Sequence, residues 1–563
     1  MKLLRRETSL YLLAFLLALT VRIIKLGDLP LTDLEAKWAL QALGVTQGTQ
    51  PVLGSEPAYV LLTSIFFFLY GDGTNFLARL APALAGSALT FVPFLFRERL
   101  KPRPALILAF FLALDPGLVA LSRQAGSPIL ALTFLLFGWG MLWPGKQARW
   151  AGVFFGLALL SGPSLWAGLL GLGLTWAIRQ GMEGGLQTST SESPERSDWL
   201  TVFWFAAGTI VVGGTLFLLS PNGLSAWASS LPEYLHGWIQ PSGVSIRRML
   251  FALPVYEPLA VILGSIAIVR GWLNGSRRVK RLSLWALVAL LLALFYPAHQ
   301  VADLMWALVP LWALAALELA RNLKILPAER NEVIGVAALS VLILIFIWLD
   351  FLALLQTPSP SGPATLRVWL MFGSLFLLIV SILLVAVGWS VRSARLGGIW
   401  GLIATLGICS FGAMIGAAGL RVTPGAEMWE AGSRPAQADL LLDTIDQMSN
   451  WSDNNVNAQP VKIVSIESPA LEWLLHAHQV QALAALDPSA SPPIVITTEQ
   501  DDPSLAAGYR GESFLWRQEP LWEGAAPSDW FRWIAFHQMA QTSETVIVWV
   551  RSDLFLDSGV EKP

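Results

Sequence analysis

Long apolar runs separated by short polar loops fill the first three quarters of the chain. A helix needs about 20 apolar residues to cross the ~30 Å hydrocarbon core of a bilayer. The pattern therefore predicts a polytopic α-helical membrane protein. The first run follows a basic start, "MKLLRRETSL", and lacks a convincing cleavage site, so it reads as an uncleaved first helix. The clear runs are 8–25, 76–96, 104–121, 127–143, 199–220, 253–270, 282–297, 301–320, 332–355, 365–390 and 397–420.

Two further apolar segments, 58–71 and 150–178, do not have the length of a single span. Cytoplasmic loops are enriched in Lys and Arg. Keeping every basic loop on the side of the N-terminus requires 58–71 to lie along the outer surface. It also requires 150–178 to cross twice, as two short helices broken at "SGPS" (161–164). The pattern thus predicts about 13 transmembrane helices, a cytoplasmic N-terminus and an outer C-terminus. The basic loops are 97–103, 145–149, 270–281, 321–330 and 392–395.

Composition and charge divide the chain in two. Of 563 residues, 55% are hydrophobic and 13% are charged, whereas soluble proteins carry about 25% charged residues. Residues 422–563 hold 7 Lys and Arg against 20 Asp and Glu, while the remainder holds 30 against 19. We therefore expect a transmembrane domain, 1–421, and an acidic extracytoplasmic domain, 422–563. Residues 26–75 should form an outer loop with juxtamembrane helices.

The acidic domain has the pattern of a small α/β layer. Short β-branched runs bounded by turn residues predict strands, and apolar residues at helical spacing predict helices between them. Strands alternating with helices favour an α/β domain. The expected strands are 461–466, 492–498 and 544–550, and the expected helices are 435–448 and 468–483.

No catalytic motif is evident in this domain. It has no Gly-rich phosphate loop and no nucleophile elbow, and His476 and His478 are not spaced as metal ligands on a helix. Cys409 is the only cysteine, so no intrachain disulfide can form. We interpret the domain as a cap or recognition module. Nothing in the sequence indicates nucleic-acid binding or a metal site, and a divalent metal has no support.

The stretch "LTDLEAKWAL" (31–40) places two carboxylates, Asp33 and Glu35, just after the first membrane run. They can be surface charges at the start of a helix, where the helix dipole favours acids, or they can be catalytic. On a helix, two residues that are two positions apart point in directions that differ by about 200°. Only one of the two carboxylates can then face a given cavity. Pro30 and Thr32 favour a helix that begins at Asp33. If the protein is a transferase, Asp33 is therefore the preferred base.

Other ionisable residues gather at the predicted outer ends of the helices. Such residues are costly inside a membrane domain and often functional, although most of these lie at helix ends, where the cost is small. Together they offer charges of both signs around an outer cavity, and we expect them to bind substrate. The candidates are Arg79, Asp115, Arg123, Glu257, His299 and Asp303.

These features fit a transferase or a transporter. A transporter should have two halves with matching broken helices. The sequence shows one broken pair, at 161–164, and no counterpart in the other half. The lack of a matching second break weakly favours a transferase over a transporter.

Several segments resemble a known class. "NFLARLAPALAGSALTFVPFLFRERL", "LVALSRQAGSPILALTFLLFGWG", "GLALLSGPSLWAGLL" and "HQVADLMWALVPLWALAALELA" are similar to segments of GT-C membrane glycosyltransferases. The nearest relatives would be glycosyltransferase family 39, the protein O-mannosyltransferases and the aminoarabinose transferases acting on lipid A. The resemblance covers most of 1–421.

The resemblance implies a mechanism. An outer-loop acid activates the acceptor, a polyprenyl-phosphate sugar is the donor, and basic side chains stabilise the departing phosphate. No nucleotide is needed. On this sequence Asp33 or Glu35 would be the base, with Arg79 and Arg123 as phosphate partners. The protein's partners would then be the bilayer, the lipid-linked sugar and an acceptor of unknown kind.

The chain departs from the class at three points. The usual Asp-Glu-Ala reads Asp33-Leu34-Glu35-Ala36. Pro128 stands near the place of a second Asp, and Leu160-Ser161 replaces a Thr-Lys dipeptide. Three functions therefore stay open: a transferase using a polyprenyl-phosphate sugar, a catalytically degenerate subunit that binds such lipids, and a transporter of lipid-linked sugars.

Overall fold

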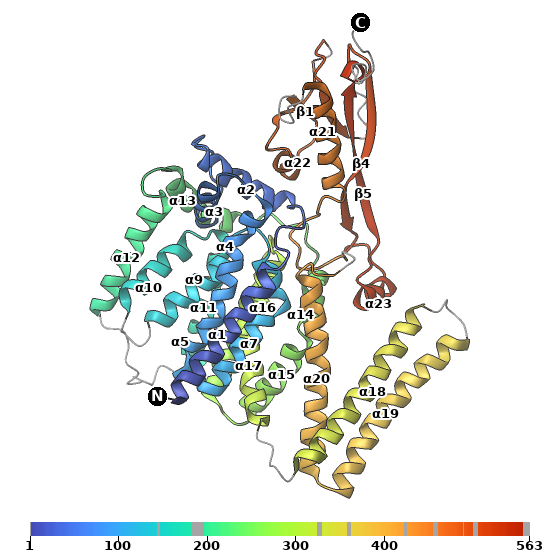
Figure 1. Ribbon diagram of the computed structural model, residues 1–563. Helices are drawn as coiled ribbons and strands as arrows, with labels where there is room; N and C mark the ends of the chain where they lie inside the picture. The colour runs from blue at the N-terminus through green and yellow to red at the C-terminus, as the bar shows by residue number, and fades with distance from the viewer. Residues whose placement is uncertain are drawn as a thin grey trace.

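The protein consists of a helical domain with an α/β domain at one end (Figure 1). The computed structural model describes residues 2–142, 147–182, 196–323, 329–356, 362–421, 425–453, 460–487, 489–498 and 505–554. The basic loops predicted at 145–149 and 321–330 lie partly outside these residues, as does the predicted domain boundary at 422.

Every predicted apolar run contains a helix. The helical domain is built from α1 (Lys2–Ile23), α2 (Asp33–Thr46), α3 (Pro57–Tyr70), α4 (Asn75–Ala88), η1 (Leu89–Phe91), α5 (Val92–Leu95), α6 (Arg97–Leu100), α7 (Pro102–Leu114), α8 (Pro116–Ser122), α9 (Pro128–Leu142), α10 (Ala148–Leu159), α11 (Pro163–Met182), α12 (Arg196–Gly214), α13 (Asn222–His236), α14 (Ile246–Tyr256), α15 (Pro258–Leu273), α16 (Arg277–Phe295), η2 (Val301–Leu304), α17 (Met305–Asn322), α18 (Arg330–Gln356), α19 (Gly362–Gly388) and α20 (Val391–Ala417).

Three of these helices are continued after a sharp break. The bends are 55° between α7 and α8, 119° between α10 and α11, and 86° between α14 and α15. Each second helix begins with a proline, Pro116, Pro163 or Pro258. Proline suits the first helical turn and keeps the residue before it out of the helix. The break predicted at 161–164 is confirmed, but the expectation of a single broken pair is wrong.

The chain is a multi-pass membrane protein. Within the described residues, five helices are long and apolar enough to cross a membrane, or eight if each bent pair is one span. The count of 13 stays a prediction. Segment 58–71 forms α3, which has 14 residues and would span about 21 Å. It packs on α2, and Phe67 stacks on Trp473 of the α/β domain at 5.8 Å. These contacts place α3 at the α/β end of the helical domain.

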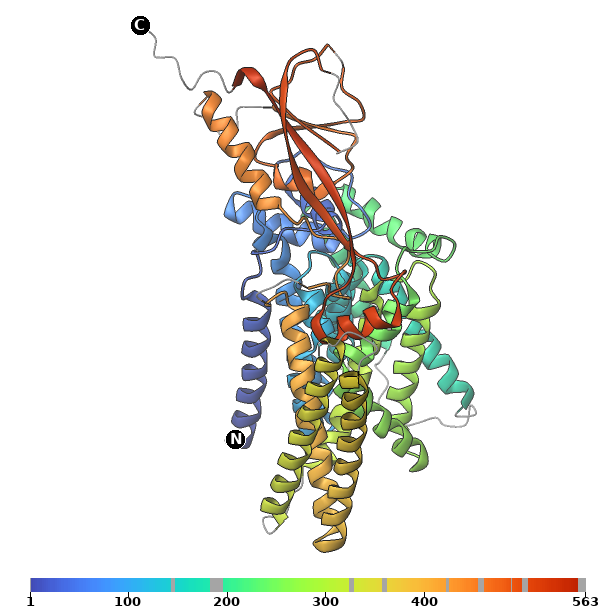
Figure 2. The same cartoon turned by 90° about the vertical axis from the view of Figure 1, so that its right-hand side faces the viewer.

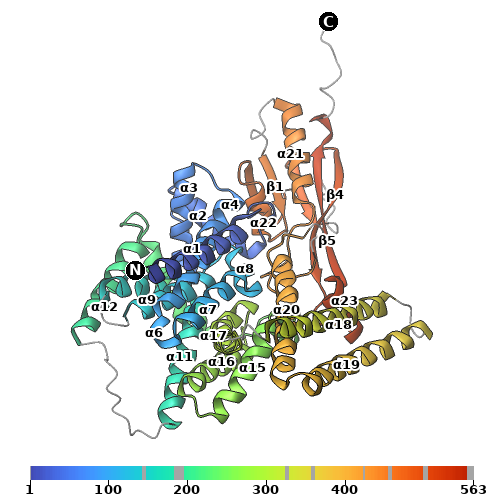
Figure 3. The same ribbon diagram turned by 60° about the horizontal axis from the view of Figure 1, so that its bottom comes forward.

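Helix α17 is the centre of the bundle, and α7, α15 and α16 pack around it (Figure 3). The α18–α19 hairpin instead projects from the side and is joined to the rest largely through α20 (Figure 1). Gly397 and Gly401 of α20 allow this contact. A Cβ at Gly397 would lie 2.4 Å from the Val336 side chain, and one at Gly401 would lie 2.6 Å from that of Ser340. Small residues four apart let membrane helices approach closely in this way.

The α/β domain contains one mixed sheet in the order β2-β1-β3-β5-β4. Strands β1, β2 and β3 are parallel, and β5 is antiparallel to β3 and β4. The β4–β5 hairpin is long and reaches back to the helical domain, where it carries α23 (Figure 2). The elements are α21 (Ala438–Asp453), β1 (Pro460–Val464), α22 (Pro469–Leu474), β2 (Gln479–Leu483), β3 (Ile494–Thr498), β4 (Tyr509–Pro520), α23 (Pro527–Phe536) and β5 (Gln541–Arg551).

The three predicted strands and the helix at 435–448 are confirmed. The helix predicted over 468–483 is only half right, because α22 ends at Leu474 and β2 follows. Side chains of α2 and α3 share one apolar core with this sheet. Helices α2 and α3 therefore belong structurally to both domains.

The predicted topology can be tested by thiol labelling of intact cells. In a Cys409→Ser background, Asn274→Cys lies in the exposed turn between α15 and α16, and Glu512→Cys lies on the exposed face of β4. Because the 270–281 loop is basic and should be cytoplasmic, a membrane-impermeant maleimide should label Cys at 512 and not at 274. Equal labelling of both positions before permeabilisation would contradict the topology.

Candidate functional site

The candidate acids lie at the start of α2, which has a complete capping box. The Thr32 hydroxyl accepts a hydrogen bond from the Glu35 amide at 3.3 Å, and the Glu35 carboxylate accepts one from the Thr32 amide at 3.0 Å. This reciprocal pair is a strong helix-start signal. It fixes Asp33 as the first helical residue, as predicted, and it turns Asp33 and Glu35 towards different partners.

Glu35 forms a buried ion pair with Arg79 of α4. Two parallel hydrogen bonds of 2.8 Å join the guanidinium to both carboxylate oxygens, and both side chains are almost fully buried. The Ala125 amide donates a further bond to Glu35 at 2.9 Å. Burial alone would raise the pKa of Glu35, but the charge and hydrogen bonds of Arg79 outweigh it and lower the pKa to about 2. Glu35 is thus held as a carboxylate.

The remaining donors of Arg79 bind the linker between α1 and α2. They reach the carbonyl oxygens of Leu26 at 3.2 Å, Leu29 at 2.7 Å and Pro30 at 3.0 Å. Arg123 has a similar role at the end of α1. It donates to the carbonyls of Val21, Arg22, Ile24 and Lys25 at 2.7–3.1 Å. Both arginines therefore hold backbone segments in this structure.

Asp33 faces the α/β domain. Its carboxylate accepts hydrogen bonds from the Ser468 hydroxyl at 2.6 Å and the Ala470 amide at 3.0 Å. Its second oxygen lies 2.6 Å from the guanidinium of Arg517 on β4. The Asp33 side chain is 29% exposed, in contrast to Glu35. Asp33 therefore lies at a junction of the two domains that solvent can reach.

Asp115 and Glu257 meet at two of the helix breaks. Each precedes the proline that starts the next helix, and both are fully buried. Asp115 accepts from the Leu118 amide and the Trp312 indole, and Glu257 accepts from the Gly117 amide at 3.1 Å. The second oxygen of Glu257 is buried without a hydrogen-bond partner among the described residues.

His299 and Asp303 lie apart from these groups, on the loop and first turn before α17. The ring nitrogens of His299 lie 2.7 Å from the Tyr296 carbonyl and 2.9 Å from the Val244 carbonyl. One oxygen of Asp303 accepts from the Gln300 amide at 2.8 Å, which caps η2. The structure thus pairs Glu35 with Arg79 and brings Asp115 and Glu257 to the first turn of α8. It does not bring all eight candidates into one cavity.

Glu56 is a carboxyl that the sequence analysis missed. It precedes α3 and accepts a hydrogen bond from the Ser127 amide at 2.8 Å. Its side chain packs against Gly162 at the break between α10 and α11. Burial raises the pKa of Glu56 to about 7, against the lowering effect of Ser127. Nothing in the sequence around Glu56 pointed to a functional role. Its partner Ser127 lies two residues after Ala125, in the same loop that binds Glu35.

A second missed feature is the segment 425–434, here called the connecting segment, which lies over the α8 and α14 end of the bundle. Trp429 is buried against Gly117, where an added Cβ would lie 2.6 Å from the indole. Tyr256 donates to Glu427, and Arg248 donates to the carbonyls of Met428 and Glu430 at 2.6–3.0 Å. The connecting segment therefore closes this end of the helical domain.

Comparison with solved structures identifies the architecture. ArnT from Cupriavidus metallidurans bound to undecaprenyl phosphate superposes with a TM-score of 0.54 at 14% identity, over 98% of this chain and 99% of that one. Its apo structure gives the same values. The chain has the GT-C glycosyltransferase fold. The Archaeoglobus fulgidus oligosaccharyltransferase complex with Zn and sulfate matches at 14% identity and a TM-score of 0.43, over 87% and 68%.

No protein-family model and no curated protein matches this sequence. The GT-C fold here includes the C-terminal α/β domain, since the likeness to ArnT covers both chains almost completely. The expected fold class is therefore confirmed. Among the described residues, no group of three His, Cys, Asp or Glu could hold a metal ion.

Glu35→Gln should destabilise the protein strongly. The substitution leaves Arg79 as a buried charge without its counter-ion, a change that costs about 3–5 kcal/mol. We expect a clear fall in Tm at pH 7 in detergent, measured by intrinsic fluorescence. Because the folded pKa of Glu35 is depressed, its contribution is complete above the unfolded pKa and is lost as pH falls towards 2.

The matched control is Glu512→Gln, on an exposed position of β4, which should leave Tm unchanged. The variant Glu35→Gln should also lack part of the acid-dependent loss of stability seen in the wild type below about pH 4.5. A Glu35→Gln protein with wild-type Tm at pH 7 would show that the ion pair does not support the fold.

Variants of Glu257 test its bond to the Gly117 amide. Glu257→Gln keeps an acceptor for the Gly117 amide, so Tm should change little. Glu257→Ala leaves buried polar groups without partners, at about 1–3 kcal/mol each, and should lower Tm. Glu233→Ala, at an exposed position of α13, is the control. Equal Tm for Glu257→Ala and the wild type would show that the bond from the Gly117 amide does not support the fold.

Proposed function

We propose that the protein is a membrane glycosyltransferase that transfers a sugar from a polyprenyl-phosphate donor to an acceptor at the outer face of the membrane. The observation that carries the proposal is the end-to-end likeness to ArnT, a protein whose structure contains undecaprenyl phosphate. A polyprenyl phosphate is confined to the bilayer, which suits a multi-pass helical domain. The N-terminus is proposed to be cytoplasmic and the α/β domain extracytoplasmic.

Asp33 is the proposed base. It is a carboxylate at the junction of the helical and α/β domains, and it is reachable by solvent. Glu35 is less suited, because Arg79 and two backbone amides occupy both of its oxygens. A base must come within about 3 Å of the proton it removes, directly or through one water. An acceptor at the junction could meet this condition at Asp33.

Arg517 is the proposed phosphate partner at the same junction. It holds Asp33 at 2.6 Å and Glu544 at 3.2 Å, and its Nε is buried without a hydrogen-bond partner. The planar guanidinium suits phosphate as well as carboxylate. When the donor binds, the Arg517 guanidinium would leave the Asp33 carboxylate and bind the donor phosphate. The Asp33 carboxylate would then be free to act as the base. Arg79 and Arg123 are already committed to carbonyl groups, so a phosphate role for them requires those bonds to open.

The proposed step balances without a cofactor. The acceptor oxygen or nitrogen forms a bond to C1 of the sugar, and the bond from C1 to the phosphate oxygen breaks. Its electron pair leaves with polyprenyl phosphate, whose charge Arg517 stabilises, and the acceptor proton passes to Asp33. Electrostatic stabilisation of the leaving phosphate is the largest expected contribution of the protein.

A catalytically inactive relative that binds polyprenyl-phosphate sugars is the second candidate. The commitment of Glu35, Arg79 and Arg123 to internal contacts favours it, because such contacts are structural. Transport of lipid-linked sugars is a third possibility, since the breaks at Asp115 and Glu257 resemble the interrupted helices of transporters.

Substitution of Asp33 tests the transferase proposal. Purified protein in nanodiscs is incubated with a panel of radiolabelled polyprenyl-phosphate sugars, and the release of polyprenyl phosphate is measured in the presence of membrane extract as acceptor. Asp33→Asn should lower release by about 10²–10⁴-fold, the usual contribution of a general base. Donor binding, followed by native mass spectrometry, should remain within a few-fold of the wild type.

Asp28→Asn is the matched control, because Asp28 is exposed in the same linker and outside the proposed site. Tm of each variant is measured to exclude loss of domain contact. Full release by Asp33→Asn would remove Asp33 as base. Donor binding by the wild type without release of any sugar would support the inactive relative instead.

A further inference from the structure

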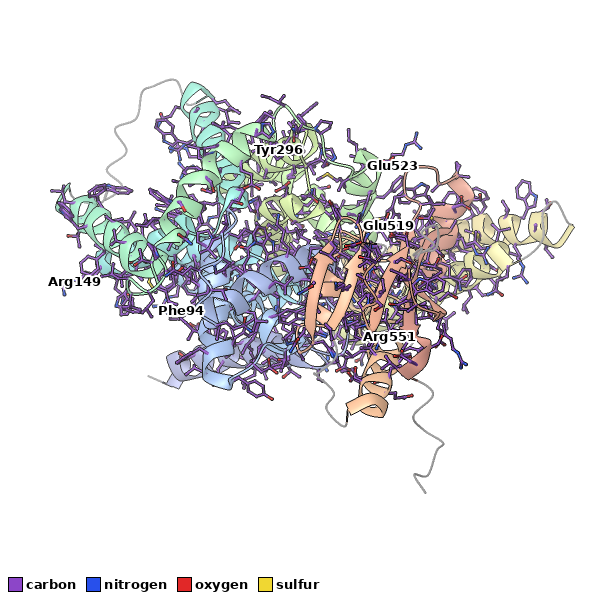
Figure 4. The ribbon with its side chains drawn as sticks, turned by 90° about the horizontal axis from the view of Figure 1, so that it is seen from above. Phe94, Arg149, Tyr296, Glu519, Glu523 and Arg551 are labelled. Carbon is purple, nitrogen blue, oxygen red and sulfur yellow. The ribbon has the colours of Figure 1, made fainter. Side chains whose placement is uncertain are left out.

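The turn between β4 and β5 reaches the side of the helical domain. Residues 521–540, here called the hairpin tip, contain α23. Figure 4 labels Glu523 in this tip and Arg551 at the opposite end of the strands. Three tryptophans of the tip, Trp522, Trp530 and Trp533, are buried in the main apolar core of the helical domain. The tip is therefore attached to the bundle by its inner face, although it belongs to the α/β domain.

The outward side of α23 carries an apolar stripe. Pro527, Phe531 and Ala535 are spaced four residues apart and so lie on one side of the helix. The Phe531 side chain is 50% exposed, and Leu521 at the start of the tip is 44% exposed. Single exposed apolar side chains are common on proteins, so the surroundings of Phe531 decide what covers it.

On one side, Phe531 continues the exposed apolar surface of α18. Its ring centroid lies 6.2 Å from that of Phe351, which in turn lies 5.6 Å from that of Trp348. Trp348 and Leu349 are themselves exposed, and α18 is one of the helices that are long and apolar enough to cross the membrane. In a bilayer, lipid covers such side chains. The lipid around this part of α18 therefore lies next to Phe531.

On the other side, α23 meets exposed apolar residues of α14. Trp530 stacks on Phe251 with ring centroids 4.9 Å apart. Phe251 is exposed, as are Leu250 and Ile246 one and five residues before it. Helix α23 therefore connects the exposed apolar side chains of α14 with those of α18. An apolar surface that continues over several elements is typical of a membrane or protein contact.

The height of this surface matches a boundary of the bilayer. Helix α18 has 27 residues and is about 40 Å long, whereas the hydrocarbon core is ~30 Å thick. Phe351 lies five residues before the end of α18 at Gln356, about 8 Å from that end. With α18 centred in the core, Phe351 and its neighbour Phe531 lie close to the edge of the hydrocarbon. Figure 2 shows α23 lying across the direction of α18, the orientation of a helix in a bilayer surface.

The polar residues of α23 suit the same position. Ser528 and Arg532, also four residues apart, are exposed on a stripe beside that of Phe531. An arginine at a membrane surface can lay its stem against acyl chains and hold its guanidinium among headgroup phosphates. A lipid surface fits this stripe better than a second copy of the chain, because Phe531 borders a helix whose own surroundings are lipid.

We propose that the hairpin tip inserts into the leaflet on the side of the α/β domain and anchors that domain to lipid. Phe531 and Leu521 contact acyl chains, and Arg532 contacts headgroup phosphates. Arg517 lies three residues before the end of β4 at Pro520, so the anchor also holds the domain junction close to the membrane surface. The anchor does not depend on the proposed transfer reaction, because an inactive relative would keep it.

Depth-dependent fluorescence quenching tests the anchor. In the Cys409→Ser background, Phe531→Cys carries a bimane probe, and the full-length protein is placed in phosphatidylcholine nanodiscs that hold one copy each. A lipid nitroxide near the headgroup should quench this probe strongly, a nitroxide near the chain end should quench it less, and aqueous iodide should have little effect. The control probe at Glu512→Cys, on the exposed face of β4, should respond only to iodide.

Equal responses of the two probes would overturn the proposal. A probe at position 531 that is shielded from lipid nitroxides and from iodide would overturn it as well, since protein and not lipid would then cover the tip.

A substitution on the apolar stripe should release the tip. With the probe moved to Leu521→Cys, Phe531→Asp should lower quenching by the shallow nitroxide and raise quenching by iodide. Ser528→Asp adds the same charge on the neighbouring polar stripe, and this matched control should leave both values unchanged. Both positions are exposed, so both variants should keep the wild-type Tm. Equal lipid quenching of the Phe531→Asp and Ser528→Asp proteins would contradict the anchor, whatever the outcome of the transfer assay.

Discussion

The buried ion pair between Glu35 and Arg79 holds the α/β end of the helical domain together. Its hydrogen bonds join α2 and the linker before it to α4 and to the loop before α9. Burying either charge without its partner would cost several kcal/mol. The pair therefore fixes where α2 begins and, with it, the direction in which Asp33 points.

The position of the α/β domain follows from this constraint. Asp33 meets Ser468 and Arg517, and α2 and α3 share a core with the sheet. The connecting segment adds a second attachment, because Trp429 fills the space that Gly117 leaves at the α8 start. Gly117 also donates to Glu257, and the next amide, that of Leu118, donates to Asp115. Domain docking and the buried carboxyl pair are consequently parts of one contact region.

The sequence predicted the elements better than the contacts between them. Apolar length located the runs, Thr32 and Asp33 marked the start of α2, and "SGPS" marked a real break. The sequence does not predict the helix break at Glu257, because apolar residues continue on both sides of Pro258. The stretch 479–483 was taken for helix because its apolar positions also fit helical spacing, and pairing with β1 decided otherwise.

The candidate site illustrates the same limit. The eight polar residues were found by their type and their place at helix ends, but nothing in a single sequence shows that Glu35 binds Arg79, 44 residues away. Arg517 was missed because it lies in the other domain. The fold could be predicted from the sequence because the order and length of the apolar runs constrain the architecture. They do not determine which side chains contact each other.

We propose that the donor phosphate binds at the junction of the two domains, beside Asp33 and Arg517. A cryo-electron microscopy map of the full-length protein in nanodiscs containing undecaprenyl phosphate tests this most directly. The account predicts phosphate density within hydrogen-bond distance of the Arg517 guanidinium, with the bond from Arg517 to Asp33 opened. Phosphate density elsewhere, with Arg517 still bound to Asp33, would contradict it.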